Sequence, residues 1–210
     1  HVTAPFEEAP DLAVLMEIGA ATKEDAEIGA DGTVALESQL ESILADAFEA
    51  ELIHDAVIAR SAAQRLNFWA MREGTLDAMQ MHGNWVMNDI SFQVSDLPGA
   101  IADMEAAFAA IAPGPFCVAF GHMGDGNLHI NARPYDRDPS ECPDEVAAIK
   151  DAVRDTVVKW RGSISAEHGI GTDKQQDMKR LKDPVAYEMM KAIKAALDPH
   201  NLLNPGKVLL

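Results

Sequence analysis

The stretch Gly121-His-Met-Gly-Asp-Gly-Asn-Leu-His129 decides the fold of this chain, because in it two histidines flank a tight turn. Asp125-Gly126 is a strong hairpin signal, since a two-residue type I′ turn needs a positive φ at both central positions. If the strands pair around this turn, His122 lies opposite His129. Directly opposed residues on one sheet face have Cβ atoms roughly 4.5–5.5 Å apart. The sequence therefore predicts two imidazoles side by side, close enough to share one metal ion.

A second polar segment, Ser165-Ala-Glu-His-Gly-Ile-Gly171, contains a carboxylate and another histidine. Two histidines and one carboxylate make a three-ligand set that leaves coordination positions open, as catalytic metal sites do. We expect His122, His129 and Glu167 to be the ligands. His168 would then be free to act as a base beside the ion. The alternatives are two surface histidines beside a hairpin and a polar loop whose glycines serve only to turn the chain.

Two more polar residues accompany these segments. Asn131 falls on the same predicted strand face as the histidines, two residues beyond His129. Arg72 shares a helical face with Phe68 and Leu76. Such an arginine either extends to water or binds a substrate carboxylate through two hydrogen bonds, and the sequence pattern leaves both open.

The composition excludes several classes of protein. A formal charge of −17 over 210 residues argues against nucleic acid and anionic membrane surfaces as partners. No run approaches the ~18 apolar residues needed to span a bilayer, and no secretion signal opens the chain. Cys117 and Cys142 are too few for a disulfide framework, so we expect a reducing compartment and a cytoplasmic protein. Because the chain opens with His1-Val2-Thr3, we expect it to be a processed form or an excised piece.

The order of expected elements indicates the fold class. Hydrophobic periodicity and turn residues predict a hairpin over 116–134, and further strands over 12–18, 54–60, 86–94 and 162–171. They predict helices over 36–52, 61–81, 98–111, 144–160, 173–181 and 184–197, with Ser61 as the cap of the second. Strands separated by helices, with one hairpin, indicate an α+β domain whose mostly antiparallel sheet is covered by helices. No domain boundary is evident.

Three motifs make the chain recognisable as a family member. The 121–129 and 165–171 segments and Asn204-Pro-Gly-Lys-Val208 together resemble the C-terminal domain of FAD-linked oxidases. This family includes relatives of D-2-hydroxyglutarate dehydrogenase, D-lactate dehydrogenase and the glycolate oxidase flavin subunit. The resemblance covers essentially residues 1–210 as one ferredoxin-like, substrate- and metal-binding domain. It does not extend to the family's N-terminal FAD-binding domain, which is absent from this chain.

The resemblance also assigns roles to residues. It implies that His122, His129 and Glu167 bind a divalent metal, with zinc as our expectation, and that His168 is the catalytic base. It further implies roles for Arg72 in holding the substrate carboxylate, Asn131 in lining the substrate pocket and Asn204 beside the flavin. D-2-hydroxyglutarate dehydrogenases have a lysine at the position of Met87 and a threonine at that of Leu76, and both help to bind a second carboxylate. These departures leave a monocarboxylic 2-hydroxy acid open as substrate.

The expected function is the substrate- and metal-binding half of an FAD-dependent enzyme that oxidises a D-2-hydroxy acid to the 2-oxo acid. The ion would bind the substrate's hydroxyl and carboxylate oxygens, and the hydride would pass to the flavin. We expect the chain alone to be inactive. Its expected partners are the small hydroxy acid, its own FAD domain and an unidentified electron acceptor, with a homodimer left open. The alternatives are a metal-binding or structural domain without a flavin partner and a metal-dependent hydrolase.

Overall fold

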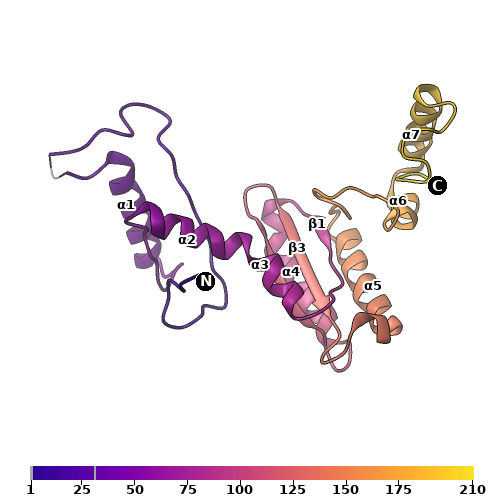
Figure 1. Ribbon diagram of the computed structural model, residues 1–210, viewed down its shortest axis with the longest axis horizontal. Coiled ribbons are helices and arrows are strands. Elements are labelled where there is room, and N and C mark those ends of the chain that lie inside the picture. The colour runs from indigo at the N-terminus through magenta and orange to yellow at the C-terminus, as the bar shows by residue number, and fades with distance from the viewer. Residues whose placement is uncertain (1, 31) are drawn as a thin grey trace. The chain divides into compact units, whose positions relative to one another are not determined.

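The computed structural model describes residues 2–30 and 32–210 (Figure 1). These residues form two compact units, which divide between Met79 and Gln80. Across the described residues the fold is α+β, with seven α-helices and one three-stranded antiparallel sheet. The predicted fold class is therefore confirmed, although the sheet has fewer strands than the sequence pattern predicts. None of the described helices has the length and apolar composition required to cross a lipid bilayer.

The N-terminal unit is mainly helical. It contains α1 (Ala35–Glu49), α2 (Ala62–Glu73) and most of α3 (Thr75–Met81). Ser61 caps α2 as predicted, because its side chain accepts a hydrogen bond from the backbone N–H of Gln64 at 3.2 Å. The single helix predicted over 61–81 is wrong in one detail, since it is interrupted at Gly74.

Two predicted strands of the N-terminal unit are wrong. Residues 12–18 and 54–60 adopt irregular backbone in the structure, and Leu12 and Met16 are exposed. An apolar run becomes a strand only when a neighbouring strand pairs with its backbone. The sequence of these two segments shows that they are apolar, but it does not show whether a second strand is available to pair with them.

The C-terminal unit contains the sheet, whose strand order is β1 (Asp89–Ser91), β3 (Asn127–Arg133) and β2 (Phe116–His122). The strand predicted over 86–94 is shorter than expected, with an additional isolated bridge between Val86 and Ala132. The strand predicted over 162–171 is wrong, because only Ser163 pairs, in one antiparallel bridge with Ser91.

Four α-helices of this unit lie at the expected places, and a fifth only ends in it. Around the short η1 (Val94–Asp96) and η2 (Pro139–Glu141) lie α4, α5, α6 and α7, which span Leu97–Ala109, Pro143–Lys159, Gln175–Leu181 and Pro184–Leu197. Pro98 and Pro143 lie in the first turns of their helices, where a missing backbone N–H costs nothing. The fifth, α3, ends in this unit and is followed by Gly83, whose φ is +103°.

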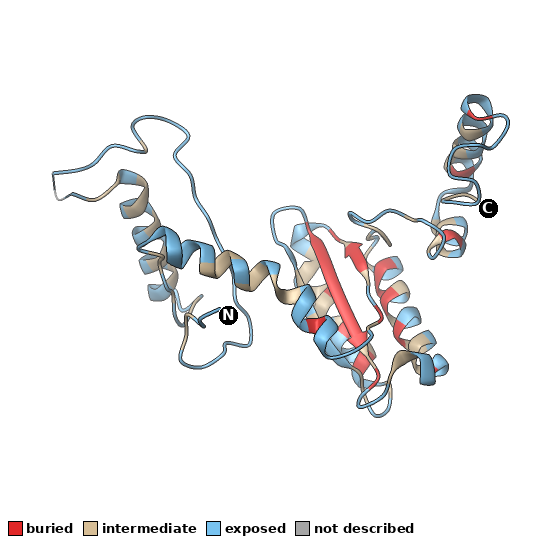
Figure 2. Cartoon of the chain, in the orientation of Figure 1, coloured by how far each residue is buried: buried red, intermediate tan, exposed pale blue. Residues whose placement is uncertain are grey.

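The two faces of β3 differ in chemistry. Leu128, Ile130 and Ala132 point to one face and pack with α4 and α5 in the hydrophobic core. The helices contribute residues at helical spacing, namely Ala100, Met104 and Phe108 from α4 and Ile149, Val153 and Val157 from α5. Figure 2 shows that buried residues concentrate along β3 and on one side of α5. The opposite face of β3 carries polar side chains, and these form the candidate site.

Candidate metal centre

The hairpin places both histidines on this polar face, but not in the predicted register. Phe120 lies opposite His129, and His122 lies opposite Asn127. The prediction that His122 faces His129 is therefore wrong by two residues. Side chains in a strand alternate between faces with a period of two, so a two-residue shift leaves both imidazoles on the same face. They are diagonal neighbours instead of direct ones.

The register differs because the connection is a four-residue loop over 123–126. Gly126 has a positive φ of 76°, as predicted, but Asp125 does not. The Asp125 carboxylate instead accepts the backbone N–H of Asn127 at 2.9 Å, and the N–H of Gly126 donates to the His122 carbonyl at 3.2 Å. An aspartate that bonds to the backbone two residues on forms an Asx turn, which the two-residue hairpin pattern did not anticipate.

The structure brings the three predicted ligands together. Glu167 lies with one carboxylate oxygen 4.0 Å from His122 Nε2 and the other 3.9 Å from His129 Nε2. One donor atom from each of the three residues lies within 4.8 Å of the others. Tetrahedral ligands at ~2.0–2.1 Å from zinc are ~3.4 Å apart, so small side-chain movements would close this group around an ion.

The burial of the three side chains indicates an open site. His129 is nearly buried on the central strand, whereas the side chains of His122 and Glu167 are 51% and 47% exposed. Solvent, or a substrate, can therefore reach the group from one side. The donor set of imidazole and carboxylate suits zinc and similar divalent ions. The residues present thus fit a divalent metal, and their role as ligands stays a prediction.

His168 lies beside this group. Its ring stacks on the ring of His129, with centroids 5.4 Å apart and planes inclined by 26°. His168 is exposed and lies in an irregular segment between Ser165 and Gly171. This placement suits a base that reaches a substrate at the metal, although the assignment stays a prediction.

Asp89 was not predicted as a site residue. It lies opposite His129 in the register, is 2% exposed, and forms a second donor group with His129 and His168. Burial acts to raise the pKa of the Asp89 carboxyl, but hydrogen bonds from the backbone N–H groups of His168 and Glu167 help to hold that pKa below its ordinary value. The available sequence signal was an aspartate in the middle of the strand predicted over 86–94.

Unpartnered buried atoms also gather on this face. Asp89 Oδ1 and both polar side-chain atoms of Asn127 are buried without a hydrogen-bond partner among the described residues. Buried polar groups in proteins normally have partners. Their concentration beside His129 is what a site that binds additional groups would show.

The remaining predicted residues are placed as follows. Asn131 is 1% exposed on the same face of β3, where its Oδ1 accepts the backbone N–H of Asn88 at 3.3 Å. Arg72 lies in α2 of the N-terminal unit and is half-buried. Asn204 is exposed in the C-terminal tail, with a positive φ of 47°. The proposed contacts of these three residues with substrate or flavin stay predictions.

A comparison with known families identifies the chain. A family model described as "FAD linked oxidases, C-terminal domain" matches residues 26–208. The chain belongs to this family. The membership links an FAD cofactor to the protein and agrees with the resemblance carried by the three sequence motifs.

Named relatives of this oxidase domain are similar over most or nearly all of its length. A D-2-hydroxyglutarate dehydrogenase of Stutzerimonas stutzeri (strain A1501) is 35% identical over 208 residues, which are 99% of this chain and 42% of the relative. The mitochondrial enzyme of the same name in Danio rerio is 33% identical over 99% of this chain and 36% of its own. The Arabidopsis thaliana enzyme is 36% identical over 81% of this chain and 29% of its own. This oxidase domain thus spans less than half the length of these relatives.

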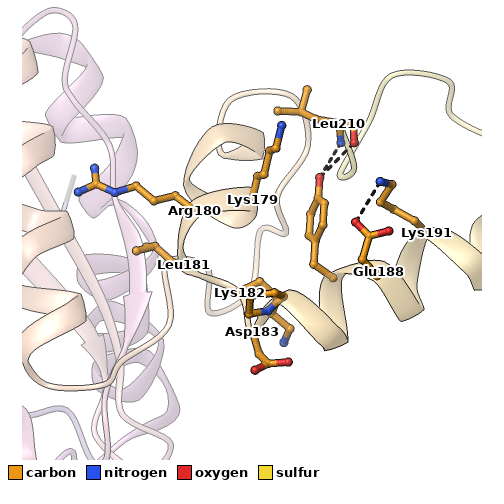
Figure 3. A pocket seen from close by; sticks show the side chains of 10 residues that line it. Lys179, Arg180, Leu181, Lys182, Asp183, Glu188, Lys191 and Leu210 are labelled. Atoms are coloured by element: carbon orange, nitrogen blue, oxygen red, sulfur yellow. Dashed lines mark hydrogen bonds and ion pairs between the residues drawn. The ribbon is translucent and has the colours of Figure 1, made fainter.

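A pocket lies elsewhere in the oxidase domain, between α6 and α7 (Figure 3). Its basic side chains are Lys179, Arg180, Lys182 and Lys191, and Lys191 pairs with Glu188 at 3.1 Å. The Tyr187 hydroxyl on its wall accepts a hydrogen bond from the backbone N–H of Leu210 at 2.9 Å. None of the predicted site residues lines this pocket, so it is separate from the metal centre.

Proposed function

We propose that this chain is the substrate- and metal-binding half of an FAD-dependent dehydrogenase that oxidises a D-2-hydroxy acid to the 2-oxo acid. The observation that carries the proposal is the open group of His122, His129 and Glu167, with the ring of His168 stacked beside it. The three relatives described above are named D-2-hydroxyglutarate dehydrogenases, which supports the same class of reaction.

The cofactors in this proposal have separate tasks. His122, His129 and Glu167 would hold a divalent ion, zinc in our proposal, which when bound supplies Lewis acidity to the substrate hydroxyl. FAD, held mainly by an N-terminal FAD-binding domain, supplies the hydride acceptor. This chain without that domain would have no turnover.

The residues of this chain would bind the substrate and move its proton. His168 would accept the hydroxyl proton on a ring nitrogen, because it is exposed next to the ion's ligands. Arg72 would bind the substrate carboxylate, Asn131 would line the pocket and Asn204 would lie beside the flavin. The last three assignments rest on the family resemblance alone.

Two positions bear on the number of carboxylates in the substrate. Met87 and Leu76 are apolar and exposed, where D-2-hydroxyglutarate dehydrogenases have a lysine and a threonine that help to bind a second carboxylate. We therefore keep a monocarboxylic 2-hydroxy acid open beside the dicarboxylate named by the relatives. Only a direct comparison of substrates distinguishes them.

The test uses the full-length protein with a panel of D-2-hydroxy acids and an artificial electron acceptor, before and after treatment with a chelator. We expect reduction of the acceptor with at least one D-2-hydroxy acid, loss after chelation and recovery on adding a divalent metal. Absence of any reduction across the panel, with FAD bound, would overturn the proposed function.

Other parts of the proposal concern architecture. The order β1–α4–β2–β3–α5, with Ser163 bridged to β1, supports a ferredoxin-like arrangement whose last strand is reduced to one bridge.

A homodimer and a cytoplasmic location stay proposals. A two-metal hydrolase is less well supported, because the two donor groups found in the described residues share His129.

A further inference from the structure

Asp89 is a buried carboxylate whose two oxygens face two different parts of the candidate centre. Oδ2 accepts hydrogen bonds from the backbone N–H groups of Ala166, Glu167 and His168, at 3.1, 2.9 and 2.8 Å. The hydroxyl of Ser165 also approaches Oδ2, at 3.4 Å. One oxygen therefore accepts the backbone N–H groups of three consecutive residues, whereas the Ser165 hydroxyl donates at shorter range to the Gly169 carbonyl, at 2.9 Å.

This segment carries a predicted ligand and the predicted base, yet it belongs to no helix or strand. Residues 165–168 lack the ladder of backbone hydrogen bonds that positions His122 and His129 in the hairpin. Successive N–H groups that converge on one anion form a concave backbone arrangement, and the anion holds the segment in that conformation. Asp89 supplies this anion from the protein itself.

The other oxygen faces His129. Oδ1 lies 3.7 Å from His129 Nδ1, whereas His129 Nε2 faces Glu167. Oδ1 is buried and has no hydrogen-bond partner among the described residues. A distance of 3.7 Å is longer than a hydrogen bond, and a movement of less than ~1 Å would make it one. An imidazole that binds metal through one nitrogen almost always donates its other N–H, often to a carboxylate.

The same contacts explain why Asp89 is not itself assigned as a ligand. Oδ2 is surrounded by three backbone N–H donors, whose positive ends would repel a cation at that oxygen. The ammonium of Lys174 lies nearby and donates to the Asp89 backbone carbonyl at 3.2 Å. The surroundings of the Asp89 carboxylate thus suit an acceptor of hydrogen bonds from the protein and not a metal ligand.

We propose that Asp89 is the positioning residue of the metal centre. Through Oδ2 it fixes the segment that presents Glu167 and His168, and through Oδ1 it holds His129 in the tautomer that leaves Nε2 for the ion. The inference rests on the metal centre of the proposed function. It adds that two ligands from distant parts of the chain are aligned by one carboxylate.

The test compares Asp89→Asn with Asp89→Ala in the full-length protein. An asparagine oxygen can still accept the segment's N–H groups, but its NH₂ group, turned toward His129, cannot accept from Nδ1–H. We expect Asp89→Asn to lower the affinity for Zn²⁺ about 10–100-fold, the usual effect of removing a ligand's outer partner. We expect Asp89→Ala to lower it further and to accelerate hydrogen exchange of the amides of residues 166–168.

The matched control is Asp138→Asn. Asp138 also accepts a loop N–H, from Ser140 at 2.9 Å, and its other hydrogen-bond donors, the Ser140 hydroxyl and Asn84, lie outside the candidate site. This variant should bind Zn²⁺ with wild-type affinity. The wild-type protein supplies an independent measurement, because its 166–168 amides should exchange slowly without metal. Rapid exchange of these amides in the folded wild type would overturn the proposal even if both Asp89 variants fail to fold.

The outcomes separate this inference from the proposed function. If Asp89→Asn and Asp89→Ala bind Zn²⁺ within twofold of wild type while His122→Ala loses it, the metal centre stands and the positioning role is wrong. If His122→Ala also binds Zn²⁺ as tightly as wild type, the metal centre itself is wrong. The visible spectrum of bound Co²⁺ provides a second readout, since a misaligned His129 alters the absorption of the ion without requiring turnover.

Discussion

At the scale of the residue, His129 is the centre of the candidate site. It lies on the central strand, stacks with His168, and faces Asp89 on one side and Glu167 on the other. We expect His129→Ala to abolish bound metal while the fold is retained, as measured by elemental analysis and circular dichroism. Stoichiometric metal in purified His129→Ala would contradict the site. His82→Ala, at an exposed histidine outside the donor groups, is the control and should keep its metal.

His168 should behave differently from His129. If it is a base and not a ligand, His168→Ala in the full-length protein retains its metal and loses turnover. A general base typically contributes ~10²–10⁴-fold to the rate, so kcat should fall by this factor. Steady-state kinetics beside a metal assay would test the distinction. Loss of metal together with activity would indicate that His168 is a ligand instead.

At the scale of the element, α7 presents an apolar stripe. Val185, Met189, Ile193 and Leu197 recur every fourth residue and are all more than half exposed. Such residues stabilise this chain little by burial. We expect Ile193→Lys to change the free energy of unfolding by less than about 0.5 kcal/mol and to reduce binding of a hydrophobic dye. A loss of several kcal/mol in urea denaturation would show that the stripe is buried in solution.

The end of α7 depends on a carboxylate. Asp198 accepts a hydrogen bond from Lys194 and the backbone N–H groups of Leu202 and Leu203, at 2.8 and 2.9 Å for the latter two. These contacts, with Lys194 the largest cause, hold the pKa of the Asp198 carboxyl below its ordinary value of 3.8. Since the folded pKa is lowered, its contribution to stability is present above about pH 4 and is lost as pH falls through the folded pKa.

Asp198→Asn tests this linkage. Wild type should be more stable than the variant at pH 6, and the difference should shrink as pH falls below 4 in paired urea denaturations. The direction follows because a protonated carboxyl resembles the neutral amide. A stability difference that is unchanged between pH 6 and pH 3 would show that the carboxylate contacts do not contribute.

At the scale of the whole molecule, the best-packed part is the core of the C-terminal unit. Ile149 of α5 is fully buried among residues of α4 and the sheet. We expect Ile149→Ala to lower the free energy of unfolding by about 2–5 kcal/mol, because it removes apolar contact and leaves a cavity. The control is Lys150→Ala on the exposed side of the same helix, whose ion pair with Asp173 spans 3.8 Å. Equal losses for the two variants in denaturant titrations would contradict this location of the core.

Prediction from sequence succeeded where a pattern is local. Helices such as α5 and α7 were located to within two residues, because proline, capping residues and helical spacing are all encoded nearby. The hairpin was also located correctly. Its register was not, because whether Asp125 adopts a positive φ or bonds to Asn127 is decided by the loop's own hydrogen bonds.

Prediction failed where structure depends on distant partners. The strands expected over 12–18 and 54–60 did not form, since an apolar run does not specify the strand that would pair with it. Asp89 was missed for the same reason. Asp89 lies beside His129 because β1 pairs with β3. It contacts Glu167 through a hydrogen bond between residues 78 positions apart in the chain.

The amino-acid sequence was sufficient to predict the α+β class, the helices of the C-terminal unit and the residue types of the candidate centre, because each is recorded in short-range spacing. The folded structure was needed to show that His122, His129 and Glu167 meet, and that one buried carboxylate contacts both the histidine strand and the Glu167 segment. Contacts of this kind join segments 38 or more positions apart, and the conformation of the intervening chain is set by packing as a whole.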